Sequence, residues 1–212
     1  MKRAFLRHLA FGLLVSAGMT ASLAVRAEDQ APDAFIKQMS TEVLDTIRAD
    51  KTIKSDLGRV VALVDAKIIP NVNFSRMTAS AVGPAWRQAS PEQQKRLTEE
   101  FKTLLVRTYA GALQQVSDQT ISMKPLRASP DDREVVVRSE VKGSGDPIQL
   151  DYRLEKTPGQ GGGWKIFNLN VLGVWLVETY KSQFTAEVSA KGIDGLIATL
   201  AERNKTNAAK KN

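Results

Sequence analysis

The segment Ile148-Gln-Leu-Asp-Tyr-Arg-Leu-Glu155 alternates apolar and polar side chains without a break. A period of two indicates a β-strand with one buried and one solvated face. The same period occurs upstream at 121–124 and 135–142, and residues 164–172 follow as a strand that is apolar on both faces. Connectors rich in Gly, Ser, Pro and Asp separate the four segments. Residues 118–172 therefore predict a four-stranded antiparallel meander.

Helical patterns lie on both sides of this meander. Apolar residues recur every three or four positions at 32–50, 55–69 and 73–82. A longer helix begins at Ser90, where Ser90-Pro-Glu-Gln93 forms a capping box with proline at the first position. Its apolar stripe continues to Val116 and is wide, so we expect it to pack against a broad sheet. Two more helices are predicted at 177–190 and 193–203.

The order of these elements predicts an α+β fold, in which helices wrap a curved four-stranded antiparallel sheet. Such a cone resembles the NTF2-like and cystatin-like folds, and it can enclose either a packed core or an apolar cavity. We expect a single domain at 28–203, built from a mostly helical part at 28–116, the meander at 118–172 and C-terminal helices at 177–203. Residues 204–212 are a polar basic tail.

The first 27 residues have the pattern of a cleavable signal peptide. A positive start precedes an apolar stretch at 9–19, and small residues stand before a cleavage position after Ala27. The apolar stretch is shorter than the roughly 20 residues that span a bilayer. His8 is the single histidine and the chain has no cysteine. The exported part therefore has no Cys/His zinc site, no Ser-His-Asp triad and no thiol nucleophile.

The net charge of +7 does not indicate a nucleic-acid partner. The leader holds four basic residues and no acidic one, which leaves 26 basic and 23 acidic residues in the exported part. Several of these basic residues lie in the C-terminal tail, and the others are interspersed with acids. A basic stripe on the folded body, typical of nucleic-acid binders, is missing from the pattern.

Local motifs give few catalytic candidates. The glycine-rich segment 159–163 lies between two strands, so it predicts a hairpin tip rather than a phosphate loop, which precedes a helix. The adjacent carboxylates of 131–132 and 99–100 are explained by a turn and by a solvated helix face. Trp164 is expected in the core. Trp175 fits either the core or the mouth of a pocket.

Several short motifs, taken in their order and spacing, resemble the MlaC (toluene-tolerance) family. They are Asn73-Phe74, Gly83, Trp86-Arg87, Ser90-Pro-Glu-Gln93, Leu105-Val-Arg-Thr-Tyr-Ala110, Asp151-Tyr-Arg153, Trp164-Lys-Ile-Phe-Asn-Leu169, Gly173-Val174, Ser182-Gln-Phe184 and Lys191-Gly-Ile-Asp-Gly-Leu196. The resemblance runs from the first predicted helix to about Leu200. This chain departs from the family at Phe167-Asn168, where Tyr-Asp is usual, and at Trp175, where Ser is usual.

The resemblance implies a periplasmic phospholipid shuttle of a Gram-negative bacterium, with no catalytic residue and no cofactor beyond its lipid cargo. It implies an apolar cavity for acyl chains, with the head group left outside. It also implies two partners, an inner-membrane ABC transporter with an MCE-domain ring and an outer-membrane lipoprotein–porin complex. Shuttling between the two membranes would maintain the lipid asymmetry of the outer membrane.

On this basis we predict lining residues from both layers of the fold: Val64, Ile68, Phe74, Met77, Trp86, Leu105, Tyr109, Val137, Tyr152, Trp175 and Tyr180. We expect the Trp175 ring to narrow the mouth of the cavity. The head group would meet one or two of Arg87, Lys124, Arg153 and Lys181, which predicts weak selectivity.

Two other classes of function remain open. One is an enzyme on a similar cone, in which Asp151, Tyr152 or Arg153 would perform acid–base chemistry on a small apolar substrate. A buried carboxylate in the cavity would favour this enzyme, and an all-apolar lining would argue against it. The other is a solid-core adaptor module of the periplasm.

Overall fold

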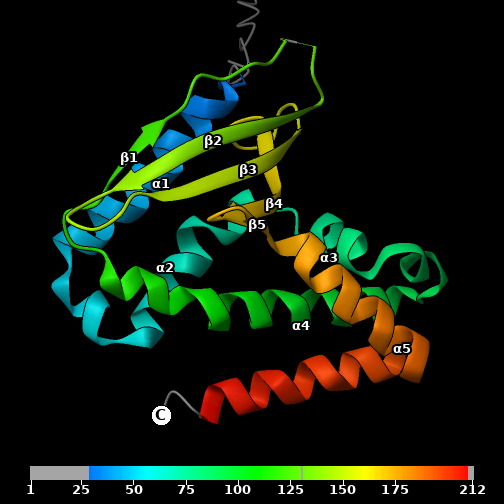
Figure 1. Ribbon diagram of the computed structural model, residues 1–212. Coiled ribbons are helices and arrows are strands. Elements are labelled where there is room, and N and C mark those ends of the chain that lie inside the picture. The colour runs from blue at the N-terminus through cyan, green and yellow to red at the C-terminus, as the bar shows by residue number, and fades with distance from the viewer. Residues whose placement is uncertain (1–28, 130, 210–212) are drawn as a thin grey trace, which may run out of the picture.

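The computed structural model describes residues 29–129 and 131–209. Within this part the chain is an α+β protein with five α-helices and one five-stranded antiparallel sheet. Figure 1 shows the sheet standing above a layer of helices. The predicted signal peptide and the last residues of the basic tail lie outside the described residues.

The four predicted strands are confirmed, and they pair in sequential order as a meander. Their bounds are β1 (Thr120–Met123), β2 (Glu134–Lys142), β3 (Ile148–Lys156) and β4 (Trp164–Val171). The structure adds a short fifth strand, β5 (Val174–Trp175), where the sequence predicts only a segment leaving the sheet. A tight turn at Leu172 and Gly173 sends the chain back beside β4, and both residues have a positive φ. Residues 159–163 form the tip between β3 and β4, as expected for a hairpin.

The predicted helices are also confirmed. They are α1 (Pro32–Ala49), α2 (Leu57–Lys67), α3 (Phe74–Val82), α4 (Pro91–Tyr109) and α5 (Leu176–Ala209). Short 3-10 turns, η1 (Lys51–Ser55), η2 (Ile69–Asn71), η3 (Gly83–Gln88) and η4 (Ala110–Gln115), connect them. The capping box at Ser90 is present in full. Gly192 has φ 71° and kinks α5 between the two predicted C-terminal helices. The second of these continues past Arg203 to Ala209.

Helix α1 covers one face of the sheet. Phe35 and Ile36 are buried against Val137 and Leu154 in one apolar cluster, and Val135, Tyr152, Trp164 and Ile166 complete it. Trp164 is in the core as predicted, and its indole nitrogen donates to the Gln30 carbonyl at 2.9 Å. The cluster joins the N-terminal helix to three strands far away in sequence, so it closes the fold on one side.

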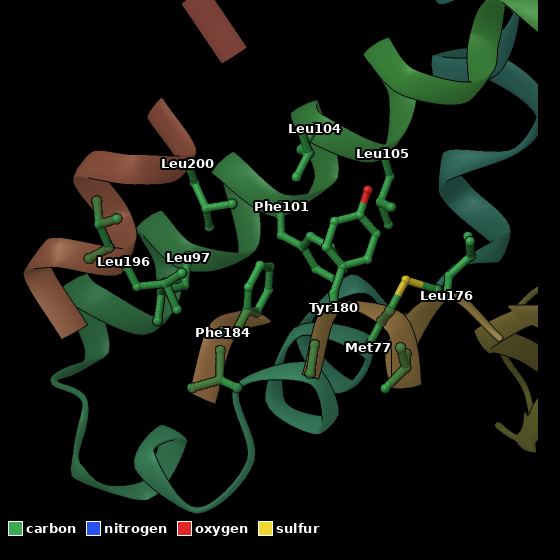
Figure 2. Packing of buried hydrophobic residues seen from close by; sticks show 14 residues of the cluster. Met77, Leu97, Phe101, Leu104, Leu105, Leu176, Tyr180, Phe184, Leu196 and Leu200 are labelled. Atoms are coloured by element: carbon green, nitrogen blue, oxygen red, sulfur yellow. The ribbon is translucent and has the colours of Figure 1, made fainter. Parts of the chain in front are cut away.

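The apolar stripe of α4 packs on helices, and the predicted sheet partner was wrong. Phe101 meets Tyr180 and Phe184 of α5 edge-on, with ring centroids 5.0 and 5.1 Å apart. Figure 2 shows these rings between the two helices, with Leu97, Leu196 and Leu200 farther along. Since the Gly192 kink folds the second half of α5 back, α5 supplies the wide partner surface that we expected from a sheet. Within the described residues, no helix has the length and apolar character needed to cross a bilayer.

Candidate functional site

One face of the sheet is lined by apolar side chains from every strand, and we call it the inner face. The pairing register places Val137, Tyr152 and Leu169 side by side in one row. The next rows along the strands hold Leu150 and Val171, with Val174 of β5 at the edge. Directly paired residues in a sheet project to the same side, so these side chains form one continuous surface.

The inner face is covered at one end and open at the other. Under α1, Val137 and Leu154 are 1% and 0% exposed. At the opposite end, Ile148 is 41% and Val174 54% exposed. Leu150 lies between these extremes and is half-buried. Burial of aliphatic side chains stabilises a folded protein, so the exposed aliphatic side chains at this end of the inner face suit contact with an apolar ligand or partner.

Helices α2 and α4 form a layer below the sheet (Figure 1). Their principal packing partners are other helices and the 3-10 turns. Their cluster of buried side chains includes Val64 and has half-buried members at its surface: Leu57, Val61, Ile68, Ile69, Val106 and Leu113. Tyr109, at the end of α4, is 39% exposed. Leu169 and Val72 pack against both the α1–sheet cluster and the α3–α4–α5 cluster, so the layers meet at this point.

The outer face of the sheet is polar. Asp151 projects from this face, whereas Tyr152 projects from the inner face. Asp151 is paired with Arg138 and Asn170, and its Oδ1 is buried without a hydrogen-bond partner. The Tyr152 hydroxyl is on the inner face, hydrogen-bonded with Ser40 and Ser139, and burial raises its pKa. Because neighbours on a strand project to opposite faces, Asp151, Tyr152 and Arg153 do not converge on one substrate. This geometry argues against the acid–base site considered from sequence.

A polar cavity of about 170 Å³ lies at the outer face, where β4, α3 and α5 meet. It is lined by Arg153 and Lys181, together with Ser80, Phe167, Asn168, Val177 and Glu178. Arg153 forms an ion pair with Glu178, and Asn168 donates to the same carboxylate at 2.8 Å. Burial alone would raise the pKa of Glu178, but the hydrogen bonds from Asn168 and Arg153 lower it below its usual value. Within the described residues, no group of acidic side chains is arranged to hold a metal ion.

The structure distributes nine of the eleven predicted lining residues over three apolar clusters. Met77, Leu105 and Tyr180, with Phe74 and Trp86 at the margin, belong to the α3–α4–α5 cluster. Val64 and Ile68 belong to the cluster around α2. Val137 and Tyr152 lie on the inner face under α1. Tyr109 and Trp175 are outside all three clusters.

Trp175 lies on the other side of β5 from Val174. It is paired with Asn170 of the outer face, and the Arg153 guanidinium stacks over its ring at 4.1 Å. Among the four predicted head-group residues, Arg153 and Lys181 share the polar cavity. Arg87 lies in η3, and Lys124 pairs with Glu140 at 2.9 Å, so neither lines that cavity.

The predicted lining residues did not include three residues at the open end of the inner face: Ile148, Leu172 and Val174. Leu172 is 64% exposed, the largest value among the exposed large apolar residues. The sequence held little signal for it, because Leu172-Gly173 is not among the residue pairs favoured in two-residue hairpin turns. The buried Asn168, which fixes the start of α5, was noted only as a departure from the family pattern.

The fold and this open apolar face define a class of protein, a helix-wrapped α+β protein with a surface suited to an apolar ligand. The sequence profile of the MlaC protein family matches residues 37–202, and the chain belongs to this family. It is 47% identical to a phospholipid-binding protein from Ralstonia solanacearum, solved in complex with a phospholipid. The alignment covers 83% of this chain and 98% of that one, with a TM-score of 0.78.

Two curated relatives agree with this assignment. The chain is 29% identical over 185 residues to the toluene tolerance protein ttg2D of Pseudomonas putida, covering 86% of this chain and 84% of the relative. It is 24% identical over 189 residues to the intermembrane phospholipid transport system binding protein MlaC of Haemophilus influenzae, covering 87% and 88%.

Proposed function

We propose that this chain is a periplasmic phospholipid carrier that holds acyl chains between the open end of the inner face and the α2–α4 layer. The observation that carries this proposal is the continuous apolar surface that leads from buried Val137 through Leu150 to exposed Ile148 and Val174. The relatives support it, because one is named as a phospholipid transport binding protein and another was solved with a phospholipid.

The energetics favour a carrier that covers its cargo. Each methylene left in water costs about 0.8 kcal/mol, so two ordinary acyl chains would cost on the order of 25 kcal/mol. Transfer from a bilayer to an apolar protein surface is close to neutral, because both environments exclude water. The direction of transport can then be set by the partners. A binding role needs no reacting group.

Among the predicted lining residues, we assign tail contacts first to the partly exposed Ile68 and Tyr109 and to Val137 and Tyr152 of the inner face, with Val64 and Leu105 behind them. Phe74, Met77, Trp86 and Tyr180 would contribute by shaping the adjacent α3–α4–α5 cluster. Trp175 projects to the opposite side of β5 from Val174, so we assign it no tail contact. Leu150, Val171 and Val174 extend this set because they share the inner face.

We further propose that the head group stays in solvent and is weakly selected. The cations Arg153 and Lys181 lie at the outer face, and Lys124 is already paired with Glu140, so these three cations do not gather at the open end of the inner face. Competition between phospholipids with matched tails and different head groups tests this point. A preference above about 100-fold, or about 2.7 kcal/mol, would contradict weak selectivity.

The proposed partners follow from the family. An inner-membrane ABC transporter with an MCE-domain ring would exchange lipid with the carrier at one membrane, and an outer-membrane lipoprotein–porin complex would do so at the other. The carrier would thereby maintain outer-membrane lipid asymmetry. Co-purification of the chain with each complex tests these two contacts separately.

Mass spectrometry of lipid extracted from protein purified without detergent tests the carrier function. We expect phospholipid in a stoichiometric amount. Leu150→Asp places a charge on the inner face and should abolish lipid retention, whereas Val136→Asp places the same charge on the solvated side of β2 and should leave it unchanged. A lipid-free wild type, or equal retention in both variants, would overturn the proposal.

A further inference from the structure

We propose that the β4–β5 turn is a membrane-contacting tip that enters the surface of a phospholipid bilayer while lipid is exchanged; this inference rests on the carrier function above. The tip consists of Ile148, Leu172 and Val174. They are 41%, 64% and 54% exposed, and they belong to the few large apolar side chains exposed in the described part of the chain. The Leu172 amide donates to the Gln149 carbonyl at 3.0 Å, which holds the turn against the start of β3.

The backbone of the tip is strained at its most exposed residue. Leu172 has φ 51°, and it is the one residue other than glycine with a positive φ in the described ranges. Gly173 follows with φ 88°, so the pair has the left-handed conformation of a two-residue hairpin turn, for which Asn-Gly is favoured. Leucine in this conformation is disfavoured sterically, and its exposure is also unfavourable. Neither cost is offset by packing inside the protein, which indicates that the side chain acts on something outside it.

The composition around the tip identifies a lipid surface as that partner. Residues 171–177 carry no charge. Trp175 lies immediately behind the tip, and the Arg153 guanidinium stacks over its ring. Aliphatic residues in front, with tryptophan and arginine behind them, match the depth profile of a bilayer, where tryptophan occupies the interface and arginine reaches the head groups.

The tip also continues the inner face. Val174 is paired with Val171, and Val171 with Leu150, so apolar side chains extend from the turn to the proposed acyl-chain site. An acyl chain that leaves a bilayer along this path exchanges one apolar environment for another. A tip held at the head-group level would therefore lower the barrier to lipid uptake and release, in addition to contributing binding affinity.

Leu172→Asn separates this role from a structural one. Asparagine tolerates the left-handed conformation better than leucine, so the variant should fold with an equal or higher melting temperature. Its partition onto phosphatidylcholine vesicles, measured by co-sedimentation, should fall about tenfold, because a largely exposed leucine no longer enters the bilayer. Val136→Thr removes apolar surface from the outer face, where Val136 is 37% exposed, and should partition like the wild type.

The outcomes of this experiment test the membrane-contacting tip separately from the carrier function. Wild-type binding that persists at high ionic strength, together with weaker binding of Leu172→Asn, supports the tip. Equal binding of wild type and Leu172→Asn, no binding of the wild type, or binding lost on adding salt would each overturn it, the last in favour of a charged docking surface. The lipid content of the same preparations reports independently on the carrier function, so a lipid-free protein with a working tip would overturn only that function.

Discussion

Asn168 shows how one buried side chain fixes the geometry beside the site. It is 1% exposed, and its Oδ1 accepts from the amides of Val177 and Leu169 at 3.1 and 2.9 Å. Its Nδ2 donates to Glu178 at 2.8 Å. The residue therefore ties β4 to the first turn of α5 and positions the edge strand between them.

Replacing this residue should be costly. Asn168→Ala leaves the buried Val177 amide without its acceptor and Glu178 without one donor. An unsatisfied buried polar group costs about 1–3 kcal/mol, so we expect the free energy of unfolding to fall by about 2–3 kcal/mol. Urea denaturation measures this value. If the free energy of unfolding fell by less than about 0.5 kcal/mol, water molecules or rearranged neighbouring groups would have to replace these hydrogen bonds.

Glu178 should make stability depend on pH in the acidic range. Its pKa in the folded state is lowered, so its carboxylate form stabilises the fold above the pKa of the unfolded chain, and this contribution disappears as pH falls through the folded value. The melting temperature of the wild type should exceed that of Glu178→Gln at neutral pH, and the difference should narrow below about pH 4. A difference independent of pH would show that the carboxylate charge is not involved.

At the element scale, local patterns predicted most of the fold. The capping box located the start of α4, and the period of two located four strands. The partner of α4 was not predictable, because it depends on how α5 folds back far along the chain. Strand β5 was missed because two residues are too few to show a period.

The kink in α5 depends on Gly192. Its φ of 71° and ψ of −175° lie in a region essentially restricted to glycine. We expect Gly192→Ala to destabilise the protein by about 1–3 kcal/mol, because the kink lets Leu196 and Leu200 reach α4. Gly145 has open space around it, so Gly145→Ala should change stability by less than about 0.5 kcal/mol in the same thermal unfolding experiment. Equal effects of the two substitutions would contradict this role of the kink.

At the scale of the whole molecule, alternation predicted which side chains share the inner face but not how far helices cover it. Val137 and Ile148 have the same pattern in sequence, yet one is 1% and the other 41% exposed. How much of the inner face is covered depends on where α1 ends relative to the sheet. This position is set by tertiary packing and not by the local sequence. The predicted lining residues were likewise divided by tertiary packing, nine among three clusters and two outside them.

Bound lipid should stabilise the whole molecule. A ligand that binds only the folded state adds about 2.7 kcal/mol when its concentration is 100 times its dissociation constant. Protein stripped of lipid by solvent extraction and refolding should therefore melt at a lower temperature, and phospholipid should restore the original value. If the soluble head-group moiety alone restored the melting temperature, the binding energy would come from head-group contacts and not from the acyl chains.

Photocrosslinking with a phospholipid that carries a diazirine near the end of one acyl chain tests the central claim most directly. If acyl chains lie between the inner face and the α2–α4 layer, peptide mapping should find adducts at inner-face positions such as Leu150, Leu169 and Val171, and at Ile68 or Tyr109 of that layer. Excess unlabelled phospholipid should suppress these adducts. Adducts concentrated on the outer face, or on the polar cavity around Arg153 and Lys181, would contradict the account.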